Sequence, residues 1–167
     1  RAVVTKHLDK LGIEYTVKED LIEQKITNLT MNPSIEIRDY QEGILSSIMF
    51  NKHKEGIIHA STGSGKTIVM LELIKRLNLT ATILVPNTLV LRQVEGEAKK
   101  FYGYTPEIIG DGSKKIGDVT ISTFQSLFNN PQLLKELSNN TSLLMIDECH
   151  GVVSDERIKV IKEFRPK

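Results

Sequence analysis

Residues 60–67 read Ala60-Ser61-Thr62-Gly63-Ser64-Gly65-Lys66-Thr67, a glycine-rich stretch between two segments of different apolar pattern. The run before it, Gly56–Ala60, is typical of a buried strand. The residues after it repeat apolar side chains at 68, 71, 74 and 77, as a helix does. A strand, a glycine-rich turn and a helix are the context of a phosphate-binding loop, whose backbone N–H groups and helix N-terminus hold phosphate oxygens. We expect Lys66 to reach the β- and γ-phosphates and Thr67 to bind Mg²⁺.

A second apolar run, Ser142–Ile146, ends on Asp147-Glu148-Cys149-His150. A carboxylate at the carboxyl end of a buried strand lies where ligands gather in α/β sheets. We expect Asp147 to hold Mg²⁺ and Glu148 to orient and deprotonate the attacking water. An Asp-Glu pair alone also fits a solvated strand end. Together with the loop it indicates nucleotide hydrolysis.

These motifs resemble those of superfamily two helicases and translocases. Residues 147–150 resemble the DEAH/DECH form of the family's Walker B box, and residues 60–67 resemble its first motif, in which Ala replaces the first Gly. Three further segments resemble family motifs in the expected order: Arg38-Asp39-Tyr40-Gln41, Val85-Pro86-Asn87-Thr88 with Gln93, and Ser122-Thr123-Phe124-Gln125-Ser126-Leu127. The resemblance runs from about Arg38 to His150. It is nearest to phage branch-migration helicases and DNA-repair helicases of the XPB kind.

The resemblance implies roles for residues outside the phosphate loop. Gln41 carries an amide that can bond the edges of adenine, and Arg38 and Tyr40 would line that pocket. His150 would couple the nucleotide site to the strand-binding side. The residues that would contact nucleic acid are Asn87, Thr88, Arg92, Gly110, Gly112, Lys114, Thr123 and Gln125.

Simpler interpretations of three of these features stay open. Gln41 also fits a solvent-exposed residue at a helix start, and Arg92 also fits a solvated charge. The loop 109–115, with two glycines and two lysines, also fits a basic surface turn.

The composition agrees with this resemblance but adds little to it. A length of 167 residues suits one domain, and the net charge of +1 means that any nucleic-acid contact must be local. The single cysteine, Cys149, excludes an internal disulfide framework and suits the reducing cytoplasm. No apolar run approaches membrane-spanning length.

Alternating apolar patterns predict an α/β fold, here a RecA-like P-loop domain over residues 35–167 with a parallel sheet covered by helices on both faces. The predicted strands are Gly56–Ala60, Ala81–Val85, Thr105–Ile109, Asp118–Ser122 and Ser142–Asp147. The predicted helices are Asp39–Phe50, Lys66–Leu77, Thr88–Phe101, Pro131–Ser138 and Ser154–Phe164.

Residues 1–34 have a different pattern, with a possible helix over Val3–Leu11, a short strand over Ile13–Val17 and a polar linker near Pro33. The resemblance implies that they are the tail of a small accessory domain. Their composition alone equally fits a terminal arm packed on the core.

The resemblance implies the first RecA-like domain of an ATP-dependent DNA helicase or translocase acting in branch migration, recombination or repair. A second RecA-like domain would supply the arginines that complete hydrolysis, so we expect this stretch alone to lack full activity. We also expect it to fold by itself as a monomer, because its sheet can be covered on both faces. Two alternatives stay open: an RNA helicase of the same fold, since such motifs contact the sugar–phosphate backbone, and the motor subunit of a restriction-type nuclease. A non-enzymatic nucleotide switch is weaker, because a switch would not need Glu148.

Overall fold

The computed structural model describes residues 29–30, 32, 34–50, 56–61, 63–103, 105–149 and 154–164. The predicted helix Val3–Leu11 and strand Ile13–Val17 lie outside the described residues, and so do Thr62 and His150. The assignment of residues 1–34 to an accessory domain therefore stays a prediction.

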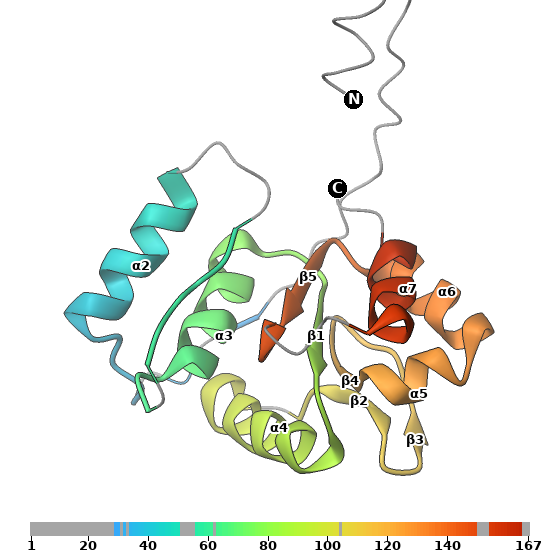
Figure 1. Cartoon of the computed structure of the whole chain (residues 1–167). Coiled ribbons are helices and arrows are strands. Elements are labelled where there is room, and N and C mark those ends of the chain that lie inside the picture. Colours follow the sequence, from blue (N-terminus) through green and yellow to red (C-terminus); the bar gives the residue numbers. More distant parts are fainter. Residues whose placement is uncertain are drawn as a thin grey trace, which may run out of the picture.

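A five-stranded sheet in the order β3-β2-β4-β1-β5 lies at the centre of the described fold (Figure 1). Its strands are β1 Ala81–Val85, β2 Glu107–Gly110, β3 Ser113–Lys114, β4 Val119–Thr123 and β5 Leu143–Ile146. β1 pairs in parallel with β4 and β5, and β2 pairs in parallel with β4. The predicted parallel sheet is confirmed for these four strands. β3 was not predicted, and it pairs antiparallel with β2 as a two-residue edge strand.

Helices cover both faces of this sheet. They are α2 Asp39–Phe50, α3 Lys66–Leu77, α4 Thr88–Tyr102, α5 Phe124–Phe128, α6 Pro131–Asn140 and α7 Asp155–Glu163. Successive strand residues point to opposite faces, so Ile83 and Val85 of β1 join a core with α2, α3 and α4, whereas Leu84 joins a second core with α5, α6 and α7. The predicted two-faced α/β fold is confirmed. No helix among the described residues is both long and apolar enough to cross a bilayer.

The prediction of a strand at Gly56–Ala60 is wrong. None of residues 56–61 belongs to the sheet, and the Ile57 side chain is 83% exposed. An apolar run supplies side chains that a buried strand could use, but it does not supply the neighbouring strand whose backbone completes the hydrogen bonds. The phosphate loop therefore approaches α3 from a segment that lies outside the described sheet.

Candidate nucleotide-binding site and nucleic-acid track

The glycine-rich loop adopts a backbone that depends on two of its glycines. Gly63 and Gly65 have φ angles of 79° and 75°, in the left-handed region that favours glycine. Gly65 is also the N-cap residue of α3, and a Cβ atom there would lie 2.6 Å from Nε2 of Gln41. The conformation at position 65 favours glycine, and a side chain there would also displace the Gln41 amide. The loop thus delivers the chain into the N-terminus of α3, where phosphate groups are favoured.

Two polar side chains of the loop suit an anionic ligand. The Lys66 ammonium donates to the carbonyl oxygens of Ala60 at 3.3 Å and Ser61 at 3.5 Å, so it is folded over the loop. The Ser64 hydroxyl is the one buried side-chain polar atom without a hydrogen-bond partner among the described residues. A polyphosphate is held by hydrogen-bond donors and positive charge. This loop offers an ammonium, an unpartnered hydroxyl and a helix N-terminus.

The first turn of α2 holds the loop from outside. The Tyr40 hydroxyl donates to the Ser64 carbonyl oxygen at 2.7 Å, and Gln41 Nε2 donates to the same oxygen at 3.3 Å. Gln41 Oε1 accepts from the Arg38 backbone N–H at 3.0 Å, and the residue is only 4% exposed. The structure therefore excludes the solvent-exposed interpretation of Gln41. Both atoms of its amide are engaged within the protein, where they hold the phosphate loop.

The acidic residues follow β5 directly. The Asp147 backbone N–H donates to the Leu84 carbonyl oxygen at 2.9 Å, which extends the β1–β5 pairing by one residue. The Asp147 carboxylate accepts the Glu148 backbone N–H at 3.0 Å. Glu148 has a left-handed φ of 55° and an exposed side chain. A non-glycine residue in that conformation is uncommon and is often found at functional sites.

Burial raises the pKa of the Asp147 carboxyl above its usual value of 3.8. The hydrogen bond from the Glu148 N–H opposes this, the negative charge of Glu148 adds to it, and the positive charge of Lys66 lowers the pKa again. The ammonium of Lys66 therefore acts electrostatically on the Asp147 carboxyl. Asp147 and Glu148 directly follow β5 at its carboxyl end.

The residues predicted to bind Mg²⁺ fit that ion. Asp147 offers a carboxylate, and Thr67 offers a hydroxyl next to Lys66 at the start of α3. Among the described residues no group of three or more His, Cys, Asp or Glu side chains could hold a metal by itself. Mg²⁺ is ordinarily bound through one or two protein oxygens together with waters and substrate phosphates.

Several residues of the predicted nucleic-acid track lie at the carboxyl ends of parallel strands. Asn87 follows β1 and caps α4, with its Oδ1 accepting from the Val90 N–H at 3.0 Å. Thr123 ends β4 and caps α5, and it is 4% exposed. Thr88 lies exposed at the start of α4. The structure thus assigns Asn87 and Thr123 a capping function and leaves Thr88 on the surface.

The loop after β2 carries the rest of the track. Gly110 and Gly112 have φ angles of 140° and 82°, and Lys114 is exposed on β3. Arg92 reaches this loop from α4 and pairs with Asp111 through two nitrogens, while its Nη1 donates to Glu95 at 2.8 Å. Arg92 lies at the surface, as the solvated-charge interpretation has it, and its guanidinium pairs there with the carboxylates of Asp111 and Glu95. The hydrogen bonds with Glu95 and Asp111 raise the pKa of the Arg92 guanidinium above its usual value.

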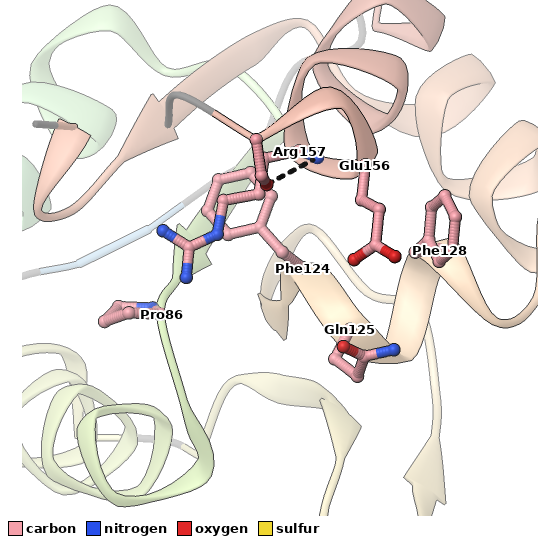
Figure 2. Close-up of a pocket in the computed structure, with 7 residues that line it drawn as sticks. Pro86, Phe124, Gln125, Phe128, Glu156 and Arg157 are labelled. Atoms are coloured by element: carbon pink, nitrogen blue, oxygen red, sulfur yellow. Dashed lines mark hydrogen bonds between the residues drawn. The ribbon is translucent and has the colours of Figure 1, made fainter. Parts of the chain in front are cut away.

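A hollow of about 330 Å³ opens beside Gln125 (Figure 2). The Nε2 of Gln125 donates to Oδ1 of Asn129 at 3.1 Å. It is lined by Pro86, Phe124, Gln125, Phe128, Ser154, Glu156 and Arg157. The Arg157 guanidinium carbon lies 5.3 Å from the centre of the Phe124 ring, a cation–π contact. The sequence did not reveal this hollow, because α5 was not predicted and α7 contributes Arg157 from a separate part of the chain.

A phosphate loop and an acidic strand end on a parallel sheet covered by helices define a RecA-like nucleotide-binding domain of the superfamily two type. The chain belongs to the family described as type III restriction enzyme, res subunit, which matches residues 34–167.

Individual relatives agree with this family. The DNA 3'-5' translocase XPB2 of Sulfurisphaera tokodaii is 32% identical over 142 residues, which are 85% of this chain and 31% of that protein. Probable helicase D10 of Escherichia phage T5 is 28% identical over 59% of this chain and 21% of that protein. The chain thus spans a third or less of these two relatives.

The fold is also that of a solved helicase. The UvsW helicase of bacteriophage T4 superposes with a TM-score of 0.64 at 20% identity, covering 98% of this chain and 65% of that chain. This likeness confirms the predicted RecA-like fold.

Proposed function

We propose that the chain is the first RecA-like domain of an ATP-dependent DNA helicase or translocase. The observation that carries this proposal is the Asp147–Glu148 pair at the end of β5, in a chain that also holds a glycine-rich loop and Lys66 at the start of α3. A loop alone would suit a kinase or a nucleotide switch. A second acid beside the metal-binding carboxylate suits an enzyme whose nucleophile is water.

Each residue of the site has one task in the proposed hydrolysis. The backbone N–H groups of the loop and Lys66 hold the polyphosphate, and Lys66 neutralises charge that builds on the β- and γ-phosphates. Glu148 orients a water molecule and accepts its proton as the oxygen attacks phosphorus. Its exposed side chain, on a residue of left-handed backbone, projects from the end of β5. Tyr40 and Gln41 keep the loop in place.

Thr67 and Asp147 would hold Mg²⁺, which on binding neutralises phosphate charge and polarises the γ-phosphoryl group. The raised pKa of Asp147 indicates a carboxylate that gains from a nearby cation. A second RecA-like domain of the full-length protein would close over this site and supply the arginines. Adenine recognition by Arg38, Tyr40 and Gln41 remains part of the proposal, although the Gln41 amide would have to exchange partners to bind the base.

DNA is the proposed nucleic acid. The Sulfurisphaera tokodaii relative is named a DNA 3'-5' translocase, and the carboxyl end of the sheet carries Thr88, Lys114 and Gln125 at the surface. Such residues contact phosphates and sugars. Branch migration, recombination and repair are the processes we propose, and the free Cys149 thiol fits a cytoplasmic location.

Hydrolysis of ATP by the full-length protein tests this function. The rate should rise on adding single-stranded, duplex, forked or four-way DNA and should respond less to RNA. Lys66→Ala should abolish it, because the charge-assisted phosphate contact is lost. Stimulation by RNA alone would instead support the RNA helicase alternative. Hydrolysis that ignores every nucleic acid would contradict a motor.

A second candidate is a motor subunit that serves a separate nuclease. The observation that favours it is the family itself, described as the res subunit of type III restriction enzymes. The two functions share this domain and differ in what the full-length protein carries beside it. Cleavage of duplex DNA in the presence of ATP would support the restriction-type function, and ATP-dependent strand separation without cleavage would support the helicase.

A further inference from the structure

An ion cluster ties α2 to α3. Its arginine lies in the last turn of α3, at the other end of that helix from the phosphate loop. Arg76, in the last turn of α3, donates through both terminal nitrogens to the two carboxylate oxygens of Glu42, at 2.7 and 2.6 Å. Its Nε donates to Glu72, one turn earlier on α3, at 2.7 Å. Lys75 also reaches Glu72, at 3.2 Å. Arg76 therefore bonds to a carboxylate on each helix, Glu42 on α2 and Glu72 on α3.

The guanidinium suits this geometry and a lysine would not. Its planar fork bonds one carboxylate with two parallel hydrogen bonds and keeps a third donor for another. Glu72 is only 2% exposed, so its charge depends on partners inside the protein. The hydrogen bond from Arg76 is the main cause that lowers the Glu42 pKa, and the bond from Glu42 is the main cause that raises the Arg76 pKa. Both groups are held in their charged forms.

The position of Glu42 connects this cluster to the nucleotide site. Glu42 directly follows Tyr40 and Gln41, which both donate to the Ser64 carbonyl oxygen of the phosphate loop. Three consecutive residues of α2 thus carry its contacts to the loop and to Arg76. The apolar packing of Leu45 and its neighbours places the helix against the core. The ion pair fixes the first turn, which bears Tyr40 and Gln41.

We propose that Arg76 is a positioning residue for nucleotide binding, which acts through Glu42 to hold Tyr40 and Gln41 against the phosphate loop. The inference rests on the proposed function, because it assumes that the loop binds nucleotide. Arg76 touches neither the nucleotide nor the reacting atoms. Its contribution is to keep the Ser64 carbonyl oxygen, and with it the adjacent Gly65, in the conformation that presents backbone N–H groups to phosphates.

Nucleotide affinity of the full-length protein, measured with a fluorescent ADP analogue, tests this inference. Arg76→Gln should weaken binding by about three- to tenfold, as is typical of coupled residues. Glu42→Gln should do the same while leaving the Arg76–Glu72 pair in place, so it serves if Arg76→Gln does not fold. Lys75→Gln is the matched control, because it removes a neighbouring positive charge from the same Glu72 without touching α2. Its affinity should stay at the wild-type value.

A double-mutant comparison separates positioning from general stability. In a Tyr40→Phe/Gln41→Ala background the loop contacts are gone, so adding Arg76→Gln should cause no further loss of affinity. The positioning role would be overturned if Arg76→Gln weakened nucleotide affinity equally in the wild-type and the double-mutant backgrounds. It would also be overturned if Arg76→Gln and Glu42→Gln both bound nucleotide with wild-type affinity. If the wild-type protein bound no nucleotide, or bound it equally well after Lys66→Ala, the proposed function itself would fail and this inference with it.

Discussion

At the scale of single residues, the site combines groups held away from their ordinary state. Glu148 has a left-handed backbone, Gly65 lies where a side chain would displace the Gln41 amide, and burial raises the pKa of Asp147. Such departures cost stability and are retained where a site needs them. Two substitutions measure that cost directly.

Asp147→Asn should stabilise the metal-free protein at neutral pH. The folded-state pKa of Asp147 lies above its usual value of 3.8, so the native state binds this proton more tightly than the unfolded state. Stability is therefore lost as the pH rises from 3.8 toward the higher folded-state pKa, and it stays lower at every pH above that pKa. The asparagine removes the ionisation and keeps the oxygen that accepts from Glu148. Thermal unfolding without divalent metal should show a higher Tm for Asp147→Asn at neutral pH, and the difference should shrink as the pH falls toward 3.8. A lower Tm at neutral pH would contradict the burial argument.

Gly65→Ala should damage both the loop and the fold. The new Cβ would meet Gln41 Nε2 at 2.6 Å and would hold a φ of 75°, a strain of about 1–3 kcal/mol. Nucleotide affinity should fall because the Ser64 carbonyl oxygen loses the hydrogen bond from Gln41. Gly43→Ala is the matched control, since a Cβ there meets nothing within 4 Å. That change lies within α2 and should raise stability by up to about 1 kcal/mol. Urea unfolding of both variants checks this, and equal behaviour of the two would exclude a special position for Gly65.

At the scale of elements, helices were the most predictable part of the chain. α2 and α3 begin and end at the predicted residues, and α3 stops at Asn78, whose left-handed φ of 54° lets it close the helix end. β3 has only two residues and α5 only five, too few for an apolar period to show. The prediction of a strand at Gly56–Ala60 was wrong because an apolar run does not specify a neighbouring strand to pair with.

The site was predictable to the extent that its chemistry is local. The loop, Lys66 and the Asp147–Glu148 pair follow from short motifs, and the structure has Lys66 at the start of α3 and Asp147 at the end of β5. The Gln41 contact with Ser64 and the Arg92 pair with Asp111 join residues far apart in the chain. No rule of sequence spacing predicts those two contacts, because they form only when the fold brings the residues together.

The N-cap of α4 allows its capping function and its proposed nucleic-acid function to be separated. Asn87→Asp keeps a side-chain oxygen for the Val90 N–H and adds a negative charge that the helix N-terminus favours, so the Tm should be equal or higher. A phosphate near that charge would be repelled by about 1 kcal/mol, roughly fivefold in DNA affinity. Asn130→Asp makes the same change at the cap of α6, outside the proposed track, and should leave DNA affinity unaltered. Equal DNA binding by Asn87→Asp and wild type would remove Asn87 from the track.

At the scale of the whole molecule, the described fold would form one wall of the proposed motor site. The relative XPB2 is about three times as long as the matched stretch, which covers 31% of it. Positive charge supplied from across a cleft is worth about 10³–10⁵ in rate in comparable enzymes. The 167 residues produced alone should therefore fold as a monomer, bind Mg-nucleotide weakly and show no DNA-stimulated hydrolysis. Light scattering and a steady-state assay with and without DNA check this, and robust stimulated turnover would contradict a two-domain mechanism.

The central claim is that the phosphate loop binds ATP and that Glu148 activates water to hydrolyse it. The most direct measurement compares the full-length wild type with Glu148→Gln, for nucleotide affinity and for DNA-stimulated hydrolysis on the same preparations. The glutamine preserves shape and removes the base, so affinity should be unchanged while turnover falls by at least about 10²-fold. Hydrolysis by Glu148→Gln at the wild-type rate would contradict the claim.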